Sequence, residues 1–312
     1  MTPGYEALRR GAAWLDLSSH GRIVARGRDR VRLLHNLTTN DVKIMVPGAG
    51  CYAFLLTPQG RIQADLCLFC FADHFLIDTQ EDLREKVPQS IRRYIIADQV
   101  ELEDVTAATA ALALEGPGAA ATLAALGAPT PGADYSHLPW ADATIAAVTL
   151  TGQPGFRIYC AAEARAELAR KLEAAGAVRA EAEDARTVRI ENGKPRYGED
   201  IRENSLPQET QQMHAVSFTK GCYLGQEIVE RIRAQGHVNE LLVRLAIDCA
   251  EPAAAGTKLL ADGAEVGEVT SAVQSPESGR VAAMAYVRTA QAAAGTILAT
   301  ANGDTVTVLS PG

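Results

Sequence analysis

The sequence has no long apolar run, no N-terminal export signal and no cysteine pattern typical of disulfides. A transmembrane helix needs roughly 20 apolar residues, and nothing in the 312-residue chain approaches this length. Residues 1–15 contain no apolar core of the kind found in signal peptides. The six cysteines are scattered, and a chain of this size does not need disulfides for stability. These absences predict a cytoplasmic protein with reduced thiols and no membrane association.

A net basic charge, phosphate-binding loops and heptad repeats are also absent. The formal net charge is −8 at pH 7, whereas a general nucleic-acid binder needs a basic surface. No glycine-rich loop of the P-loop or Rossmann kind is present. No heptad run indicates an oligomer interface. We therefore expect a monomer that does not bind nucleic acid stably.

One pair of cysteines has the spacing of metal ligands, but its context argues against a metal site. Cys67 and Cys70 lie in an alternating apolar run, which predicts a β-strand. Residues three apart on a strand point to opposite faces, so the two thiols would not converge. The chain has no second C-x-x-C and no histidine pair at matching spacing. We expect no metal site.

The order of the predicted elements indicates an α+β protein that ends in a small barrel. Strands and helices are segregated rather than regularly alternating, unlike in a doubly wound sheet. Residues 240–312 consist of short apolar runs separated by Asp-Gly, Ser-Gly and Asn-Gly turns, which favours a β-barrel. Upstream we predict a strand at 23–25, a helix from 29, hairpins over 51–78 and 144–160, helices over 81–97 and 161–177, and a connecting region with a small-residue helix over 106–133.

Residues 220–227, K-G-C-Y-L-G-Q-E, form the most specific motif of the chain. Cys222 lies between Lys220 and two glycines, and a nearby cation lowers the pKa of a thiol and favours the reactive thiolate. The alternative is a tight turn that holds a structural cysteine. A nucleophilic Cys–His pair with His214 or His237 has no accompanying acid or oxyanion signature.

A second motif, of the form R-x-E-x-G-x-x-x-Y-G, extends from Arg189 to Gly198. Its first part is predicted to be a helix that ends at Gly193. On composition alone, Arg189 and Glu191 would belong to a solvated helix end with ion pairs.

Together these motifs resemble a known family. The octapeptide resembles the K-G-C-Y-x-G-Q-E signature of the YgfZ-type folate-binding proteins, which are relatives of the glycine-cleavage T-protein (aminomethyltransferase). The second motif resembles a T-protein segment. Weaker matches in the same order cover essentially the full length, at residues 15–23, 33–42, 60–65, 267–271 and 282–287.

The resemblance implies a fold of three domains in a ring around a central channel. Residues 1–50 and 145–239 would form a discontinuous α+β domain with the folate pocket and the cysteine motif. Residues 51–144 would form a second α+β domain, and residues 240–312 the C-terminal β-barrel.

The resemblance also implies a site for tetrahydrofolate or a one-carbon derivative of it. Cys222 would be the functional thiol, with Lys220 as its cation. A carboxylate can accept two parallel hydrogen bonds from the aminopyrimidine edge of a pterin, and an aromatic ring can stack on it. Arg231 either binds the folate tail or is solvated surface charge. The folate-binding residues implied are Glu191, Tyr197, Arg189, Tyr223, Gln226, Glu227 and Arg231.

Three functions remain open at this stage. The first is a tetrahydrofolate-binding protein that supports assembly or repair of iron–sulfur enzymes, with those enzymes or assembly factors as partners. The second is a folate-dependent aminomethyl- or methyltransferase, and the third is a scaffold with a vestigial folate site. Two departures from the family pattern bear on them: residues 76–79 read L-I-D-T where the T-protein has an Asn-Ala pair, and Glu240 stands where relatives tend to carry arginine.

Overall fold

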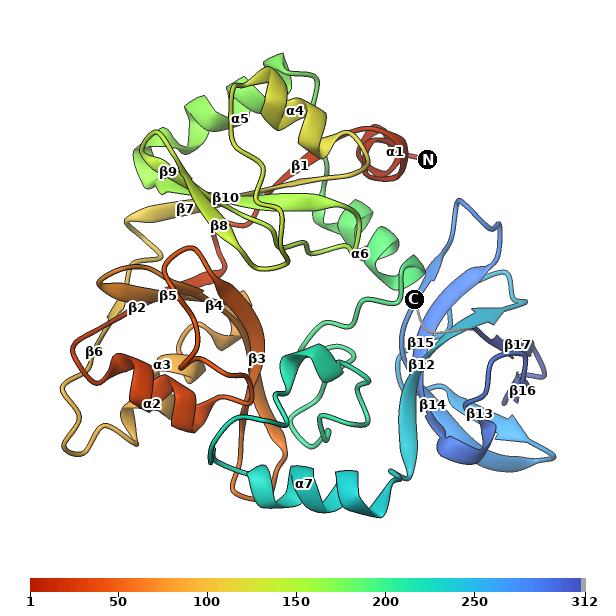
Figure 1. The fold of residues 1–312 in the computed structure, drawn as a ribbon. Coiled ribbons are helices and arrows are strands. Elements are labelled where there is room, and N and C mark those ends of the chain that lie inside the picture. Colours follow the sequence, from red (N-terminus) through yellow and green to blue (C-terminus); the bar gives the residue numbers. More distant parts are fainter. Residues whose placement is uncertain (310–312) are drawn as a thin grey trace.

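The computed structural model describes residues 1–309, with only the backbone of Gln235. It arranges them as three lobes, with the segment 192–225 running between them (Figure 1). Two lobes each contain a β-sheet with helices, and the third is a closed six-stranded barrel. The predicted α+β class with a C-terminal barrel is therefore confirmed. No helix within residues 1–309 is long and apolar enough to cross a membrane.

The first lobe is built on a six-stranded sheet in the order β11-β1-β7-β10-β9-β8. One face is covered by α4 (Ala119–Ala125) and α5 (Arg165–Ala174), and α5 buries Leu168 and Leu172 there. The opposite face shares a core with α1 (Pro3–Arg10), α6 (Ala182–Glu191) and part of the second sheet. The strands are β1 (Ala13–Asp16), β7 (Thr109–Glu115), β8 (His137–Trp140), β9 (Ala143–Ala146), β10 (Gly155–Ala161) and β11 (Val178–Arg179).

The prediction of a connecting region over residues 106–133 is wrong for its first part. Residues Thr109–Glu115 form β7, which pairs with both β1 and β10 near the middle of the sheet. Residues from Ala110 to Glu115 are all buried, because both faces of the sheet are covered. A strand buried on both faces loses the polar–apolar alternation that identifies a strand in sequence. The small-residue helix is present, as α4.

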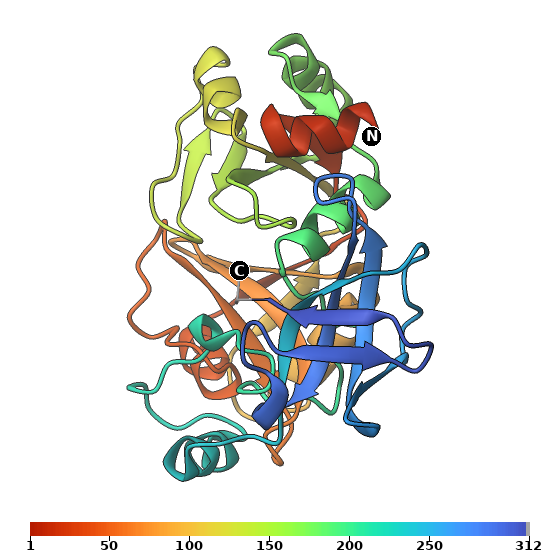
Figure 2. The same ribbon diagram turned by 90° about the vertical axis from the view of Figure 1, so that its right-hand side faces the viewer.

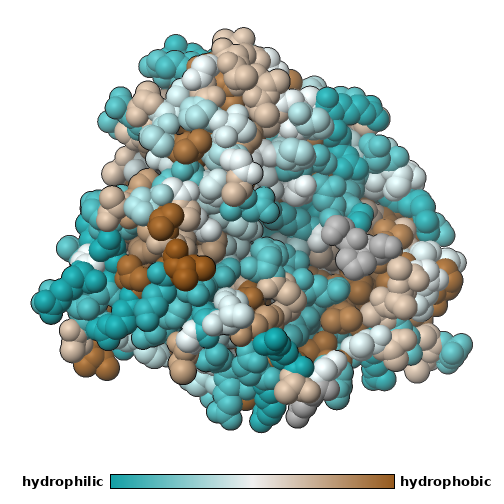
Figure 3. Space-filling model, in the orientation of Figure 1, coloured by the Kyte–Doolittle hydropathy of each residue, from teal (hydrophilic) through white to brown (hydrophobic). Residues whose placement is uncertain are grey.

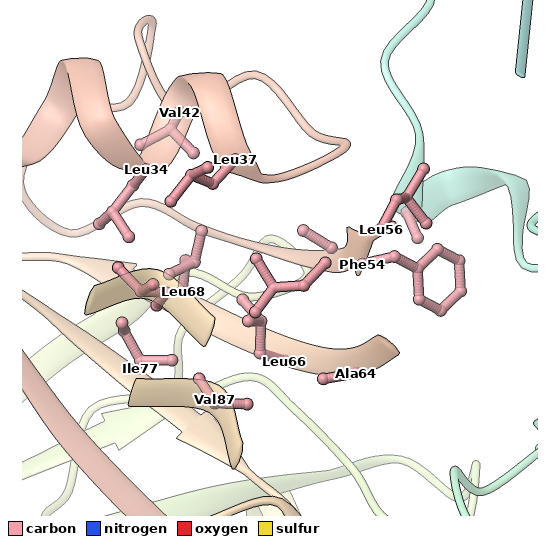
Figure 4. Close-up of a cluster of buried hydrophobic side chains, with 14 of the residues drawn as sticks. Leu34, Leu37, Val42, Phe54, Leu56, Ala64, Leu66, Leu68, Ile77 and Val87 are labelled. Atoms are coloured by element: carbon pink, nitrogen blue, oxygen red, sulfur yellow. The ribbon is translucent and has the colours of Figure 1, made fainter. Parts of the chain in front are cut away.

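The second lobe holds a five-stranded sheet in the order β3-β4-β5-β2-β6. Leu34 and Leu37 of α2 (Arg30–Leu37) pack with Val42 over Leu66 and Leu68 of the sheet (Figure 4). The strands are β2 (Gly21–Arg26), β3 (Gly50–Leu56), β4 (Ile62–Cys70), β5 (His74–Thr79) and β6 (Glu101–Asp104).

The helix predicted over residues 81–97 is shorter in the structure. It consists of a 3-10 turn, η1 (Glu81–Leu83), and α3 (Lys86–Arg92). Pro88 lies in the first turn of α3. Proline is tolerated there, but its ring would clash with the preceding turn if the helix continued upstream. The helix therefore begins only two residues before Pro88.

The barrel closes in the order β12-β15-β14-β13-β16-β17. Asp262 and Gly263, which join β13 to β14, both have positive φ, as the predicted tight hairpin requires. Figure 2 shows α6 between α1 and the barrel, and α6 contacts β14 and β15. The strands are β12 (Glu240–Ile247), β13 (Lys258–Ala261), β14 (Ala264–Gln274), β15 (Val281–Arg288), β16 (Ile297–Thr300) and β17 (Thr305–Val308).

Before the barrel, the residues that supply each sheet do not coincide with the predicted domain ranges. Residues 21–104 supply the strands of the second sheet, whereas the first sheet takes its strands from 13–16 and from 109–179. The discontinuous arrangement is thus present at the level of sheets. The ranges 1–50 with 145–239, and 51–144, stay predictions as domain limits.

Candidate functional site

Two adjoining cavities lie between the first two lobes and the segment 189–219. The first measures about 540 Å³ and is lined by β4, β5, the segment 148–157 and the segment 189–196. The second measures about 990 Å³ and extends past β3 toward the loop 40–51. Figure 3 shows a hydrophilic recess between the lobes on the face drawn in Figure 1. Residues that line both cavities are Tyr52, Asp134, Tyr135, Val148, Thr149, Gly152, Lys194 and His214.

Asp65 on β4 is the acidic group of the first cavity with the most unusual environment. Its residue surface is only 6% exposed. The hydroxyl of Tyr52, on the paired strand β3, donates to Oδ2 at 2.8 Å. The other oxygen, Oδ1, has no hydrogen-bond partner within residues 1–309. Burial raises the pKa of Asp65 to about 6, although the Tyr52 hydrogen bond opposes this shift. A carboxyl that titrates near neutral pH with a free oxygen is suited to acid–base chemistry.

Three aromatic rings stand nearly parallel where the cavities join. Tyr52 and Tyr135 have centroids 6.3 Å apart and planes 13° apart, and His214 lies 5.4 Å from Tyr52 at 23°. Tyr135 has a φ of 60°, a conformation that is uncommon outside glycine and is often found at functional sites. Burial lowers the pKa of His214, so its imidazole is neutral near pH 7. Such rings favour a flat, uncharged ring system.

An ion pair forms another part of the first cavity wall. Arg157 on β10 donates from Nη1 to Asp78 on β5 at 2.7 Å, and the hydroxyl of Tyr159 donates to the second Asp78 oxygen at 2.5 Å. Burial would raise the pKa of Asp78, but Arg157, His20 and Tyr159 together outweigh burial and hold that pKa well below its usual range. Asp78 is therefore ionised at neutral pH. Because its charge is already paired, Asp78 is a weak candidate for proton transfer.

Two cations of the segment 189–196 also line the first cavity. Lys194 donates from Nζ to the carbonyl and the hydroxyl of Thr149, and burial lowers the pKa of Lys194. Arg189 donates to Glu199 at 2.6 Å and to Asp200 at 2.5 Å, so its guanidinium is held by the protein. Arg189 is the only predicted folate-binding residue that lines either cavity in the described part of the chain.

Asp200 attaches the barrel to this wall. It is fully buried and accepts hydrogen bonds from the hydroxyls of Thr270 and Ser271 on β14, at 2.7 and 2.6 Å. It also accepts from Arg189. The barrel motif at residues 267–271 thus supplies two hydroxyl donors to a carboxylate that holds a cavity residue in place.

Glu191 and Tyr197 lie away from both cavities. Glu191 accepts hydrogen bonds from the hydroxyl of Tyr5 on α1, at 2.8 Å, and from the hydroxyl of Ser275 after β14, at 2.5 Å. It therefore ties α1 and α6 to the barrel. Tyr197 donates to the carbonyl of Gln63 at 2.6 Å. A role for either residue in folate binding stays a prediction.

Lys220 is directed to backbone carbonyls rather than to solvent. Its Nζ donates to the carbonyls of His35, Thr38 and Asn40, at 2.5, 2.6 and 2.8 Å, around the C-terminal end of α2. Such carbonyls have no partner within the helix. Burial lowers the pKa of Lys220 to about 8. The lysine therefore has a clear structural function, whereas its predicted effect on Cys222 stays a prediction.

The rest of the octapeptide forms a turn before α7 (Gln226–Gln235), at the bottom of Figure 1. Cys222 is exposed and lines neither cavity. Tyr223 is buried in the core of the second lobe. Gln226 accepts from the backbone N–H of Tyr223 at 3.4 Å, a long local contact. Gly225 has a φ of 82°, and a Cβ there would lie 2.6 Å from a backbone oxygen, so this position requires glycine. Glu227 and Arg231 are exposed.

Sequence reasoning missed most of the cavity wall, namely Tyr52, Asp65, Tyr135, Arg157, Lys194 and His214. The available signal was a charged residue inside an apolar strand, as Asp65 is in β4 and Arg157 in β10. Such residues are rarely buried without a partner or a function. Within residues 1–309, no group of three or more metal-ligating side chains is placed to hold a metal ion.

The fold is that of the glycine-cleavage T-protein family, to which the chain belongs. The profile of the GCVT N-terminal domain matches residues 2–220, and that of the glycine cleavage T-protein C-terminal barrel domain matches residues 241–308. The predicted superfamily is thereby confirmed.

Individual relatives extend this similarity over nearly the whole chain. An aminomethyltransferase of Geobacillus kaustophilus is 33% identical over 93% of this chain and 83% of its own length. A putative chloroplast transferase of Arabidopsis thaliana is 26% identical over 85% of this chain and 63% of its own length. The crystal structure of the glycine cleavage system aminomethyltransferase T from Bartonella henselae superposes with a TM-score of 0.90 and 25% identity, covering 99% of this chain and 88% of that one.

Proposed function

We propose that this protein binds tetrahydrofolate or a one-carbon derivative in the joined cavities and acts as a folate-dependent one-carbon transferase of the aminomethyltransferase type. The observation that carries the proposal is Asp65, a buried carboxyl with a pKa of about 6 on a residue that lines the first cavity. Aminomethyltransferase relatives that cover most of the chain add support.

The residues present suit a reduced pterin. The near-parallel rings of Tyr52, Tyr135 and His214 offer stacking surface to a flat heterocycle. Asp65 and Arg157 both line the first cavity, and a carboxyl and a guanidinium are groups that can bind the polar edge of a pteridine. Ligand cavities commonly measure about 300–1,000 Å³, and both cavities fall within that range.

In this proposal, Tyr52 and Asp65 act as one unit. Bound tetrahydrofolate would supply a ring nitrogen able to carry a one-carbon group. Tyr52 fixes the Asp65 carboxyl through Oδ2, which leaves Oδ1 to hold or release a proton. Because Asp65 is buried, water competes poorly for that proton.

A second candidate function keeps the folate site but replaces transfer by support of iron–sulfur enzymes, as in YgfZ-type proteins. Exposure of the Cys222 thiol favours it, because a partner enzyme or assembly factor can reach this thiol directly. One cysteine cannot hold a cluster alone, since clusters are usually bound by four thiolates. For both candidates we propose that the protein works in the cytoplasm as a monomer.

Two variants separate these functions. Calorimetry with tetrahydrofolate tests the shared folate site, and absence of binding would remove both candidates. The transferase predicts that Asp65→Asn abolishes single-turnover one-carbon transfer while Cys222→Ser retains it. The iron–sulfur function predicts the opposite pattern in a deletion strain: Cys222→Ser fails to restore iron–sulfur enzyme activity, whereas Asp65→Asn restores it. Cys249→Ser, a partly exposed barrel cysteine, is the matched control.

A further inference from the structure

Lys194 lies at the junction of the two cavities and lines both of them. It directly follows Gly193, which has a φ of 69° just after the end of α6. The Nζ of Lys194 donates to the carbonyl and to the hydroxyl of Thr149, on another part of the cavity wall. An ammonium carries three N–H donors. Among the described residues these two acceptors are the hydrogen-bond partners of Nζ, so one donor is left for a ligand.

The surroundings of this ammonium indicate that it faces the cavities. The groups whose charges act on it include Cys67 and Arg157, which line the first cavity, and Asp134, which lines both. In turn, the charge of Lys194 contributes to the lowered pKa of His214, which also lines both cavities. The half-buried lysine therefore ends between walls that come from several elements.

Among the described lysines and arginines that line the cavities, Lys194 is the one without an ion pair. The arginines of the first cavity are all paired: Arg157 with Asp78, Arg189 with Glu199 and Asp200, and Arg196 with Asp82. Glu115 acts on Lys194 only from a longer distance, and its carboxylate accepts hydrogen bonds from the backbone N–H groups of Leu150 and Thr151. In the second cavity, Lys194 is the single lysine or arginine among the described lining residues.

A half-buried ammonium without a counter-ion indicates which ligand chemistry fits. Burial disfavours the charge of Lys194 and lowers its pKa, and an anion at the remaining N–H would offset that cost. Asp41 and Asp134 also line the second cavity, so they would repel a dianionic phosphate more strongly than a singly charged carboxylate. A carboxylate also accepts a strong, charge-assisted hydrogen bond from an ammonium.

We propose that Lys194 binds a carboxylate of the ligand at the junction of the two cavities. This inference deepens the proposed folate function and rests on it for the identity of the ligand. Two sources present the same chemistry: the glutamate tail of a folate whose ring occupies the first cavity, or a small second substrate that lies beside the ring. Each cavity is within the size range of a ligand site, so the site has room for either.

Calorimetry on wild type and Lys194→Met distinguishes the two sources. Tetrahydrofolate is compared with 6-methyltetrahydropterin, which lacks the tail, and acetate is titrated as a carboxylate probe into the free protein and into both complexes. If the tail binds Lys194, the variant should lower the preference for tetrahydrofolate by at least about tenfold, as for a hydrogen bond to a charged group. Acetate should then not bind the tetrahydrofolate complex.

If a second substrate binds Lys194, acetate should bind the free protein and both complexes, and Lys194→Met should abolish this binding. The preference for tetrahydrofolate should then be the same in wild type and variant. Lys171→Met makes the same change at an exposed lysine of α5 that pairs with Glu167, and should behave as wild type in every titration.

The inference is overturned if the preference is unchanged in Lys194→Met and acetate binding is either absent or equal in the two proteins. Protein that binds neither pterin compound but binds acetate through Lys194 overturns the folate function alone. If the variant does not fold, reductive methylation of wild type followed by mass spectrometry decides. A bound carboxylate raises the pKa of the Lys194 amine, so ligand should slow its methylation by at least about fivefold and leave Lys171 unaffected. Equal rates with and without ligand would overturn the inference.

Discussion

Replacing Asp65 by asparagine should make the protein more stable while abolishing its transfer activity. The carboxyl is forced into a site that disfavours its charge, since burial raises its pKa from 3.8 to about 6. Asparagine is nearly isosteric, still accepts the Tyr52 hydrogen bond and carries no charge. Catalytic groups held in unfavourable environments commonly show this trade-off between stability and activity.

The magnitude follows from the pKa difference. A raised folded-state pKa stabilises the fold at low pH relative to high pH, and this stabilisation is lost as pH rises through about 6. Above that pH, the wild-type carboxylate costs about 3 kcal/mol, from about two pKa steps at roughly 1.4 kcal/mol each. At pH 5 most of the folded-state carboxyl is protonated, and the cost falls to about 1.5 kcal/mol.

Urea unfolding of wild type and Asp65→Asn at pH 5 and pH 8 measures this directly. The stability advantage of the variant should grow from about 1.5 to about 3 kcal/mol between these pH values. Asp73→Asn removes an exposed carboxylate of the same lobe and is the matched control. An advantage that does not change with pH, or a variant less stable than wild type at pH 8, would refute the assignment of a raised pKa to Asp65.

Three further variants test other parts of the structure. Lys220→Met should cost about 2–4 kcal/mol in urea unfolding, because it leaves three carbonyls at the end of α2 without a donor; an unchanged midpoint would show that water replaces the lysine. Asp200→Ala should cost about 2–4 kcal/mol, because it removes one of the two carboxylates that pair with buried Arg189 and the acceptor of the Ser271 hydroxyl. Native-like stability would contradict its role in attaching the barrel. Glu191→Ala should speed proteolysis of the segment between α6 and the barrel, because Tyr5 and Ser275 lose their shared acceptor. Weakened tetrahydrofolate binding with unchanged proteolysis would instead support the predicted role of Glu191 in folate binding.

Features governed by local rules could be predicted from the sequence. Turn dipeptides such as Asp262-Gly263 require positive φ and therefore identify the hairpins of the barrel. The apolar run around Cys67 identifies β4 as a strand, on which residues three apart point to opposite faces. Strand β7 could not be found this way, because its burial on both faces depends on helices contributed by distant segments.

The site was less predictable than the fold for a related reason. The motif around Cys222 is specific in sequence, but much of it forms a turn in which Lys220 and Gly225 have structural functions. The cavity is instead lined by single residues of several elements, such as Asp65 and Arg157. Each is an isolated polar position in its own strand. Only the packing of the two sheets against each other brings them together, and no local pattern encodes that packing.

The hydroxyls of Thr270 and Ser271 connect the barrel to the cavity wall. The barrel holds Asp200, and Asp200 holds Arg189 at the cavity wall. A ligand that requires an ordered wall must then favour the docked barrel, and by thermodynamic reciprocity docking favours the ligand. Any free energy that barrel docking requires is then part of the measured affinity. Amide hydrogens of β14 should exchange more slowly once the cavity is filled, although none of them touches the ligand.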